Sequence, residues 1–248
     1  MPDDRGDKKL KKTFFRIFSV GLIALLLCGN IFQLIRGGYW DKFLYRYCGV
    51  ERSNVKTNDS TVSAWRRSLV QLDYDADIAF FGDSITAGGK WQEWFPDCRV
   101  INLGVPGNAL EDMDERIDML YSVKPEKIFI MGGINGITKV TIEPYVVRYE
   151  SMIDKIYENL PETEVYIQSV LPISVEKGKQ YNIDNEAIRS FNLELQRLAE
   201  EKNCVYIDLY SLYESEGKMN PDLTRDGVHL KDDAYGPWID TIRSYIER

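Results

Sequence analysis

Residues 78–86 read Ile-Ala-Phe-Phe-Gly-Asp-Ser-Ile-Thr, and this stretch decides the fold class. Its first four residues form a continuous apolar run, which is typical of a strand buried on both faces of a sheet. Gly82 then indicates a turn, and Asp83 and Ser84 suit the start of a helix, because both side chains cap helix N-termini well. A strand that passes through a tight turn into a helix is the repeating unit of α/β proteins.

The same alternation continues along the chain. Four further runs rich in apolar residues predict strands at 99–103, 128–131, 165–171 and 205–209. Helical patterns lie between or after these strands, at 110–121, 144–159, 185–202 and 233–246. Such alternation predicts a parallel sheet with helices on both faces, and these sheets bind ligands at the carboxyl ends of their strands.

Chemically useful residues follow the predicted strands. The four motifs are Gly82-Asp83-Ser84 after the first strand, Asn102 with Gly107 at the second, Gly133-Ile134-Asn135 after the third, and Asp226-Gly227-Val228-His229 before the last helix. Because the carboxyl ends of parallel strands share one edge, we expect these motifs to meet at one rim of the sheet.

Together the motifs contain what acyl transfer requires. A serine hydroxyl such as that of Ser84 needs a base to take its proton, and His229, the only histidine, is suited to this at neutral pH. Asp226 lies three residues earlier and could stabilise the imidazolium that forms. The N–H groups of Ser84 and Gly107 and the side-chain amide of Asn135 could bind an oxyanion. Gly107 has no Cβ, so its backbone can approach a ligand closely.

Each motif also has an ordinary structural explanation. Asp and Ser cap helices, Asn and Gly occur in turns, and an Asp shortly before a His can belong to a salt-bridged surface loop. However, each motif stands at the end of a predicted strand or before the last helix, and the single histidine falls in one of them. The combination therefore favours one catalytic set over four unrelated turns.

In these four motifs the chain resembles the SGNH/GDSL hydrolase superfamily, in the same order and across residues 77–248. The resemblance implies a flavodoxin-like three-layer α/β/α sandwich with a five-stranded parallel sheet. It also implies that Ser84 is the nucleophile of a serine esterase, with Asp226 and His229 completing the triad. Ser84, Gly107 and Asn135 would form the oxyanion hole, and no cofactor or metal is implied.

The stretch Trp91-Gln-Glu-Trp-Phe95 resembles the branch of platelet-activating-factor acetylhydrolase-like and carbohydrate O-acetyl esterases. It makes Trp91 and Trp94 candidate substrate-binding residues that line an acyl or sugar pocket. The alternative is that these aromatic residues belong to the core. The chain departs from the superfamily pattern at Ile85, where Leu is usual, and at Gly136, where Asp is frequent, but both changes leave the candidate catalytic groups in place.

The N-terminal part of the chain has a different character. Residues 17–35 are 19 consecutive residues without a charge, which as a helix would span about 28 Å, close to the hydrocarbon thickness of a bilayer. Residues 1–16 are basic, so the positive-inside rule predicts a short cytoplasmic tail, a signal anchor at 17–35 and an extracytoplasmic remainder. Residues 36–76 are expected to be a linker, with an edge helix at 60–72. A cleaved signal peptide is the alternative, although its apolar core is usually shorter.

Composition excludes several other classes of protein. The net charge of −8 argues against a nucleic-acid binder, which normally presents a basic face. Four cysteines without a CxxC spacing provide neither a disulfide scaffold nor a zinc motif, and one histidine excludes a His-rich metal site. The expected partners are a small-molecule or glycan ester and the membrane.

Four hypotheses follow from the whole sequence. The first is a membrane-anchored serine esterase that hydrolyses short-chain esters, foremost acetyl esters, and could act as an O-deacetylase of glycans. The second is an O-acetyltransferase that moves acyl groups onto a cell-wall polymer, and it differs from the first by excluding water from the acyl-enzyme. The third is a lysophospholipase or thioesterase acting on lipids, and the fourth a binding module without activity.

Overall fold

The structure is a computed structural model that describes residues 64–65, 68–69, 74–137 and 141–247. The chain divides into two units, of which the second is Thr57–Arg248, and every described residue belongs to it. The predicted tail at 1–16, the anchor at 17–35 and most of the linker at 36–76 lie outside the described residues. Among the described helices, none is long and apolar enough to cross a membrane.

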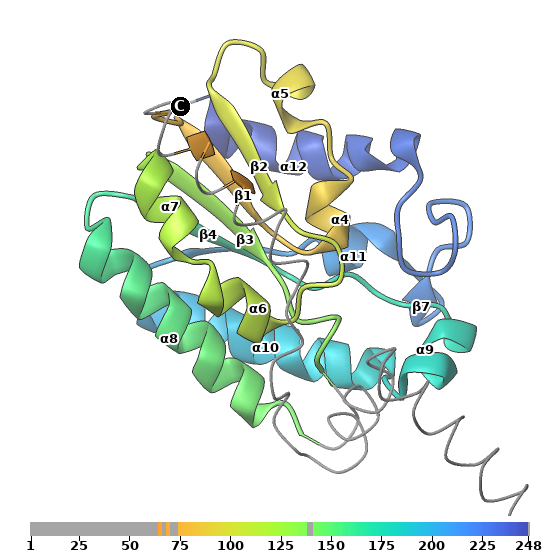
Figure 1. The fold of residues 1–248 in the computed structure, drawn as a ribbon. Coiled ribbons are helices and arrows are strands. Elements are labelled where there is room, and N and C mark those ends of the chain that lie inside the picture. Colours follow the sequence, from red (N-terminus) through yellow and green to blue (C-terminus); the bar gives the residue numbers. More distant parts are fainter. Residues whose placement is uncertain (1–63, 66–67, 70–73, 138–140, 248) are drawn as a thin grey trace, which may run out of the picture. The chain divides into compact units, whose positions relative to one another are not determined.

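A five-stranded parallel sheet forms the centre of the second unit (Figure 1). Its strands are β1 (Ile78–Gly82), β2 (Val100–Gly104), β3 (Lys127–Met131), β4 (Glu164–Gln168) and β5 (Val205–Ile207). Their order across the sheet is β2-β1-β3-β4-β5, so the chain crosses from β2 over β1 to β3. The carboxyl ends of β1, β2 and β3 are therefore neighbours. The predicted α/β fold with a five-stranded parallel sheet is confirmed.

Helices cover both faces of this sheet. Because successive strand residues point to opposite faces, the neighbours Phe80 and Phe81 identify the two sides. Phe80 stacks on Trp91 of α5 (Trp91–Trp94), which in turn contacts Trp238 of α12 (Gly236–Ile246). Phe81 lies under the guanidinium of Arg116, on the opposite face. Figure 1 shows α12 behind the sheet and the helices of the opposite face in front of it.

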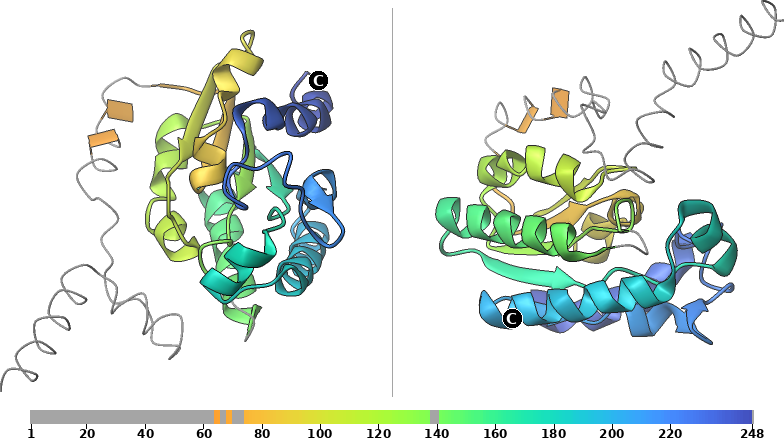
Figure 2. Two further views of the ribbon diagram at one scale, coloured as in Figure 1. Left: turned by 90° about the vertical axis from the view of Figure 1, so that its right-hand side faces the viewer. Right: turned by 90° about the horizontal axis from the view of Figure 1, so that it is seen from below.

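Four described helices, two of six residues and two of 17, cover the face in front of the sheet in Figure 1. They are α6 (Leu110–Glu115), α7 (Asp118–Val123), α8 (Glu143–Asn159) and α10 (Asn185–Glu201), and α8 packs against the other three. Figure 2 shows the same layers from two further directions. The helices α8 and α10 meet through Tyr149 and Phe191, whose rings pack edge to face. Both helices present one apolar side to the core, as their sequence periodicity predicts.

A row of aromatic rings fills the core between the sheet and α12. Phe80 stacks on Trp91 at 4.0 Å, Phe80 on Phe129 at 5.1 Å, and Phe129 on Tyr166 at 4.5 Å between ring centroids. Trp91 is only 1% exposed, and its indole N–H donates to the carbonyl of Thr86 at 2.8 Å. The structure therefore corrects the prediction that Trp91 binds substrate: its ring is enclosed by the core and cannot reach a ligand.

Several elements differ from the sequence prediction. The helix expected at 110–121 is two helices, because the backbone leaves the helical conformation at Arg116 and the side chain of Arg116 turns into the core. The strand expected at 165–171 ends at Gln168. Beyond it, the Asn192 side chain takes both backbone hydrogen bonds of Val170, in place of a neighbouring strand. The last helix begins with the 3₁₀ turn η1 (Asp232–Tyr235).

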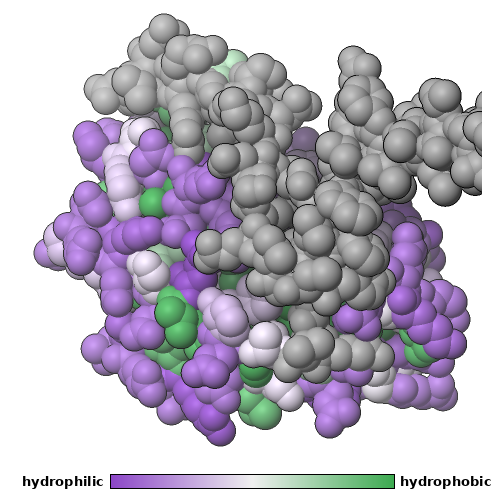
Figure 3. Space-filling view, turned by 60° about the horizontal axis from the view of Figure 1, so that its bottom comes forward, coloured by the Kyte–Doolittle hydropathy of each residue, from purple (hydrophilic) through white to green (hydrophobic). Residues whose placement is uncertain are grey.

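The helix start indicated by Asp83 and Ser84 is the four-residue helix α4 (Ser84–Ala87). Other short elements were not predicted, and they are α5, α9 (Val175–Tyr181), α11 (Tyr210–Tyr213) and the hairpin of β6 (Glu214–Ser215) with β7 (Lys218–Met219). Of the edge helix expected at 60–72, only residues 64–65 and 68–69 are described, and these are helical. Outside the grey residues, the face shown in Figure 3 is mostly hydrophilic, with scattered hydrophobic side chains.

Candidate active site

The sheet places Ser84 directly beyond the carboxyl end of β1, as the first residue of α4. Asp83 caps this helix, because its carboxylate accepts the N–H of Ile85 at 2.9 Å. Gly82 makes the turn possible: a Cβ there would collide with the Thr86 side chain and the Met131 carbonyl. The strand, the turn and the cap together hold the half-buried side chain of Ser84 at the rim of the sheet.

Three predicted residues form one chain of hydrogen bonds. The Nε2 atom of His229 lies 3.0 Å from the Oγ atom of Ser84, and its Nδ1 atom lies 2.8 Å from Oδ2 of Asp226. Ser84 and His229 are 145 residues apart in sequence, so only the fold brings them together. With Nδ1 protonated and bonded to Asp226, Nε2 is free to accept the serine proton.

The loop that carries Asp226 and His229 holds both side chains in place. The second carboxylate oxygen of Asp226 accepts the backbone N–H groups of Val228 and His229, at 3.0 and 2.8 Å. Thr224 closes the loop, since its hydroxyl donates to the His229 carbonyl at 2.7 Å. Partial burial on its own raises the pKa of Asp226, but the hydrogen bonds from His229 and Val228 lower it to about 2. The carboxylate of Asp226 is therefore ionised at neutral pH.

The candidate oxyanion residues lie on the loops after β2 and β3. Gly107 is exposed and has a φ of 80°, a conformation that residues with a Cβ rarely adopt. The side-chain amide of Asn135 donates one hydrogen bond to the carbonyl of Asn108, at 2.9 Å. An amide carries two N–H bonds, so the second remains available to a ligand. The side-chain amide of Asn102, on β2, donates to the carbonyls of Ala87 and Gly89. These bonds connect β2 to the end of α4 and to the turn that follows it.

Arg116 anchors this arrangement, although sequence reasoning missed it. Its side chain is 2% exposed and donates to the Gly82 carbonyl at 2.7 Å, the Leu103 carbonyl at 2.8 Å and Oδ1 of Asn108 at 2.6 Å. It therefore joins the ends of β1 and β2 to the loop whose carbonyl holds Asn135. The sequence does contain a feature that singles this residue out, because Arg116 is the only basic residue in the acidic stretch 110–121.

The comparisons with known proteins agree with this geometry. Residues 80–236, more than half of the chain, match the GDSL-like lipase/acylhydrolase family. The chain belongs to this family. Its members are serine hydrolases that act on ester bonds, and this chain is such a GDSL hydrolase. No match to a curated protein was found.

Solved structures similar to this GDSL hydrolase include a Streptococcus pneumoniae protein whose name refers to platelet activating factor. It is 25% identical, with a TM-score of 0.66, and the match covers 78% of this chain and 100% of that protein. A GDSL-like lipase from Bacteroides thetaiotaomicron is 21% identical, with a TM-score of 0.64 and coverage of 76% and 96%. The acetyl xylan esterase AlAXEase is 24% identical, with a TM-score of 0.57 and coverage of 68% and 98%. The last two likenesses show the shared fold.

Asp83 gives the site of this GDSL hydrolase a second, buried carboxyl group. The side chain is 1% exposed, and this burial raises its pKa to about 6, although the hydrogen bond from Ile85 and the charges of His229 and Arg116 oppose the rise. The group lies next to the nucleophile in sequence and caps its helix. Its protonation state therefore influences both the stability of α4 and the electric field at His229.

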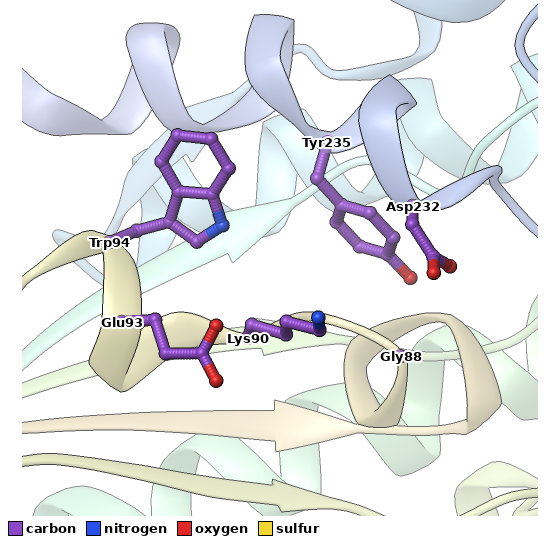
Figure 4. A pocket seen from close by; sticks show the side chains of 6 residues that line it. All are labelled: Gly88, Lys90, Glu93, Trp94, Asp232 and Tyr235. Atoms are coloured by element: carbon purple, nitrogen blue, oxygen red, sulfur yellow. The ribbon is translucent and has the colours of Figure 1, made fainter.

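Trp94, the remaining candidate, lies apart from the catalytic trio. It is 42% exposed and lines a cavity together with residues that follow Ser84 and His229 in sequence (Figure 4). In the part of the chain that the structure describes, no group of three or more His, Cys, Asp or Glu residues could hold a metal ion.

Proposed function

We propose that this GDSL hydrolase is a membrane-anchored serine esterase that hydrolyses short acyl esters, foremost acetyl esters, through an acyl-Ser84 intermediate. The observation that carries the proposal is the pair of contacts at His229, 3.0 Å to the Ser84 hydroxyl and 2.8 Å to the Asp226 carboxylate. This order of nucleophile, base and carboxylate is the arrangement that activates a serine for attack on a carbonyl.

The proposed reaction has two halves. Ser84 attacks the ester carbonyl while Nε2 of His229 takes its proton, and the resulting oxyanion accepts hydrogen bonds from the N–H groups of Ser84, Gly107 and Asn135. The C–O bond to the alcohol then breaks, and His229 gives its proton to the departing oxygen. Water, deprotonated by His229, attacks the acyl-Ser84 carbonyl, and release of the acid returns the proton to the serine. Asp226 stabilises the imidazolium in both halves.

Hydrolysis is favoured over transfer to a polymer because water reaches the catalytic base. The side chains of His229 and Asp226 are 36% and 42% exposed. An acyltransferase must keep water away from its acyl-enzyme, and a base with this exposure does not do so on its own. The preference for acetyl esters on a glycan is supported by the resemblance of residues 91–95 and by the acetyl xylan esterase among the similar folds.

Membrane attachment through residues 17–35 is a separate part of the proposal. It is supported by the 19 uncharged residues and by the basic residues that precede them. Cell fractionation of the full chain tests it: the protein should pellet with membranes and resist extraction by high salt and alkali. Protease added to intact cells should degrade the catalytic domain. Recovery of the full-length chain in the soluble fraction would refute the anchor.

The esterase itself is tested with p-nitrophenyl acetate, butyrate, octanoate and palmitate, using the full chain in a mild detergent. We expect hydrolysis to fall steeply with chain length and to vanish in Ser84→Ala. The matched control is Ser244→Ala, which alters an exposed serine on α12 and should hydrolyse as the wild type does. A folded wild type that turns over none of these esters would overturn the proposal, and a preference for palmitate would point to a lipid enzyme instead.

A further inference from the structure

Two asparagine side chains of α10 hold the chain segment that follows β4. The side chain of Asn192 accepts the N–H of Val170 at 2.8 Å and donates to its carbonyl at 2.9 Å. The side chain of Asn185 makes the same two hydrogen bonds to Ile173, each at 2.8 Å. Each asparagine thus takes the place that a neighbouring strand has for one residue of a sheet. Together, Asn185 and Asn192 form an asparagine pair on α10.

The spacing of the asparagine pair matches that of the segment it holds. Asn192 follows Asn185 by seven residues, which is a rise of about 10.5 Å along an α-helix. Ile173 follows Val170 by three residues, over which an extended chain covers about 10 Å. The segment 170–173 is therefore extended and runs antiparallel to α10, and the helix fixes both of its ends.

The next residue, Ser174, contacts the loop that carries the catalytic base. Its N–H donates to the carbonyl of Gly227 at 2.9 Å, and Gly227 lies between Asp226 and His229 in sequence. The contact is tight, because Gly227 is buried with a φ of 91° and a Cβ there would collide with the Ser174 side chain. Ser174 is also fixed as the cap of α9, which Figure 1 shows at one end of α10, since its Oγ accepts the N–H of Lys177 at 3.2 Å.

Few hydrogen bonds tie this loop to the rest of the protein. In the described part of the chain, most hydrogen bonds of residues 222–231 join the loop to itself or to its neighbours in sequence. Two reach other elements, and they are the bond from Ser174 and the contact of His229 with Ser84. Buried apolar side chains also hold the loop against the core, but apolar contacts have no preferred direction. The bond from Ser174 is therefore the directional contact that sets where the loop stands.

We propose that the asparagine pair and Ser174 are positioning residues that place His229 at hydrogen-bond distance from Ser84. The inference rests on the proposed function, in which His229 is the base, and it adds how the base is placed. Asp226 and His229 belong to one loop and keep their mutual contact when the loop moves as a unit. A displaced loop therefore loses the contact of His229 with Ser84.

The test replaces the N–H of Ser174 by a proline ring. The φ of Ser174 is −67°, a value that proline adopts without strain, so Ser174→Pro deletes this donor and keeps the course of the chain. Ser174→Ala is the reference, because it loses the same hydroxyl and retains the N–H. We expect kcat/KM for p-nitrophenyl acetate to be about 10²-fold lower in the proline variant than in the alanine variant, as for a catalytic group displaced by about 1 Å.

Val175→Pro is the matched control for the proline. Val175 is the first residue of α9, where proline is favoured because the N–H has no partner within the helix. This variant should hydrolyse p-nitrophenyl acetate as the wild type does. An equal loss of kcat/KM in Val175→Pro and Ser174→Pro would contradict the role of the bond from Ser174.

A second variant acts at the other end of the arrangement and needs no proline. Asn185→Ala removes both bonds to Ile173, and we expect kcat/KM to fall about tenfold as the segment loosens. Asn159→Ala, which alters an exposed asparagine at the end of α8, is its control and should keep the wild-type value. Both losses should disappear in a His229→Ala background, because a positioning residue acts only through the group that it places. Losses that are as large without His229 would show a general structural role and overturn the inference.

NMR separates failure of this inference from failure of the proposed function. His229 is the only histidine, so its ring C–H signals are unambiguous in a chain without a histidine tag. These signals should shift in Ser174→Pro and Asn185→Ala and stay in place in Val175→Pro. A folded wild type that hydrolyses no ester would refute the proposed function, while the ring signals would still judge the placement of His229. Unmoved signals in both variants, together with kcat/KM values equal to those of the controls, would overturn the inference.

Discussion

At the scale of single residues, the two carboxylate oxygens of Asp226 accept different hydrogen bonds and have different roles. Oδ1 accepts the backbone N–H groups of Val228 and His229, and Oδ2 contacts Nδ1 of His229. The first task shapes the loop and the second selects the tautomer of the imidazole. Because these bonds lower the pKa of Asp226 to about 2, its stabilising interaction is fully present above the ordinary value of 3.8 and is lost only as the pH falls through about 2.

Replacing Asp226 by Asn separates the two tasks. The amide oxygen can still accept the two backbone N–H groups, but the amide nitrogen cannot accept from Nδ1–H, so Nε2 becomes the protonated nitrogen. We expect kcat for p-nitrophenyl acetate to fall by about 10⁴-fold, with the fold intact by tryptophan fluorescence. A fall of less than tenfold would show that His229 does not depend on this carboxylate.

A second feature at the scale of single residues is the backbone conformation of Gly107. Its φ of 80° is nearly the same as the 78° of Gly217, and at both positions a Cβ would meet nothing within 4 Å. Alanine at either position should therefore cost a similar amount of stability, about 1–2 kcal/mol, through backbone strain alone.

Only Gly107 is a candidate oxyanion residue, so catalysis should distinguish the two glycines. We expect Gly107→Ala to lower kcat by about 10²-fold, because a displaced N–H no longer meets the oxyanion. Gly217→Ala, in the turn between β6 and β7, should keep the wild-type rate. The measurements are urea unfolding and steady-state kinetics of both variants. Equal rates for the two variants would remove Gly107 from the oxyanion hole.

At the scale of elements, the four-residue helix α4 depends on a buried cap. Burial raises the pKa of Asp83 to about 6, so the folded state holds a proton there more tightly than the unfolded chain does. The stability that this provides is fully present below the ordinary value of 3.8 and is lost as the pH rises through about 6. Above about pH 6 the buried Asp83 carboxylate is charged, and the positive charge of Arg116 partly offsets the cost of burying it.

Asp83→Asn tests this linkage, since asparagine also caps helices but does not titrate. At about 1.4 kcal/mol for each pH unit, we expect the variant to gain about 2 kcal/mol of unfolding free energy relative to the wild type between pH 4 and pH 7. Urea unfolding followed by fluorescence at several pH values measures it. A difference that stays constant over this range would mean that Asp83 titrates as an exposed carboxyl group does.

At the scale of the whole molecule, the site depends on one buried cation that joins distant parts of the chain. Arg116 donates to the carbonyls of Gly82 and Leu103 and to the side chain of Asn108. These acceptors belong to the ends of two strands and to the loop that holds Asn135. The guanidinium is planar and offers five donors, which suits it to several acceptors at fixed angles.

Arg116→Gln removes most of these donors and leaves their acceptors buried. We expect the free energy of unfolding to fall by about 3–5 kcal/mol, since a buried partner is left uncompensated, and kcat to fall as the loop after β2 loosens. Arg197→Gln on the outer side of α10 is the control, and it should change stability by less than about 0.5 kcal/mol. Similar losses in both variants would show that Arg116 is no more than a surface cation.

The sequence by itself determined the alternation of strands and helices, the parallel sheet and the four motifs at its rim. These are local properties: apolar runs, turn residues and helix caps act over a few neighbouring positions. Gly82, Asp83 and Ser84 can be understood from their neighbours in the chain alone, and so can the pairing of Asp226 with His229, which lie three residues apart. The break of the helix at Arg116 cannot, because it results from carbonyls far away in the sequence.

Only the tertiary structure decided which candidates meet and which are buried. Ser84 and His229 lie 145 residues apart, and their contact depends on the order of the strands. Trp91 and Trp94 are equivalent in the sequence, yet the packing of α5 against Phe80 buries one ring and leaves the other at a cavity. A local pattern states what a residue is able to do, whereas burial and distance depend on neighbours that the chain brings together only when it folds.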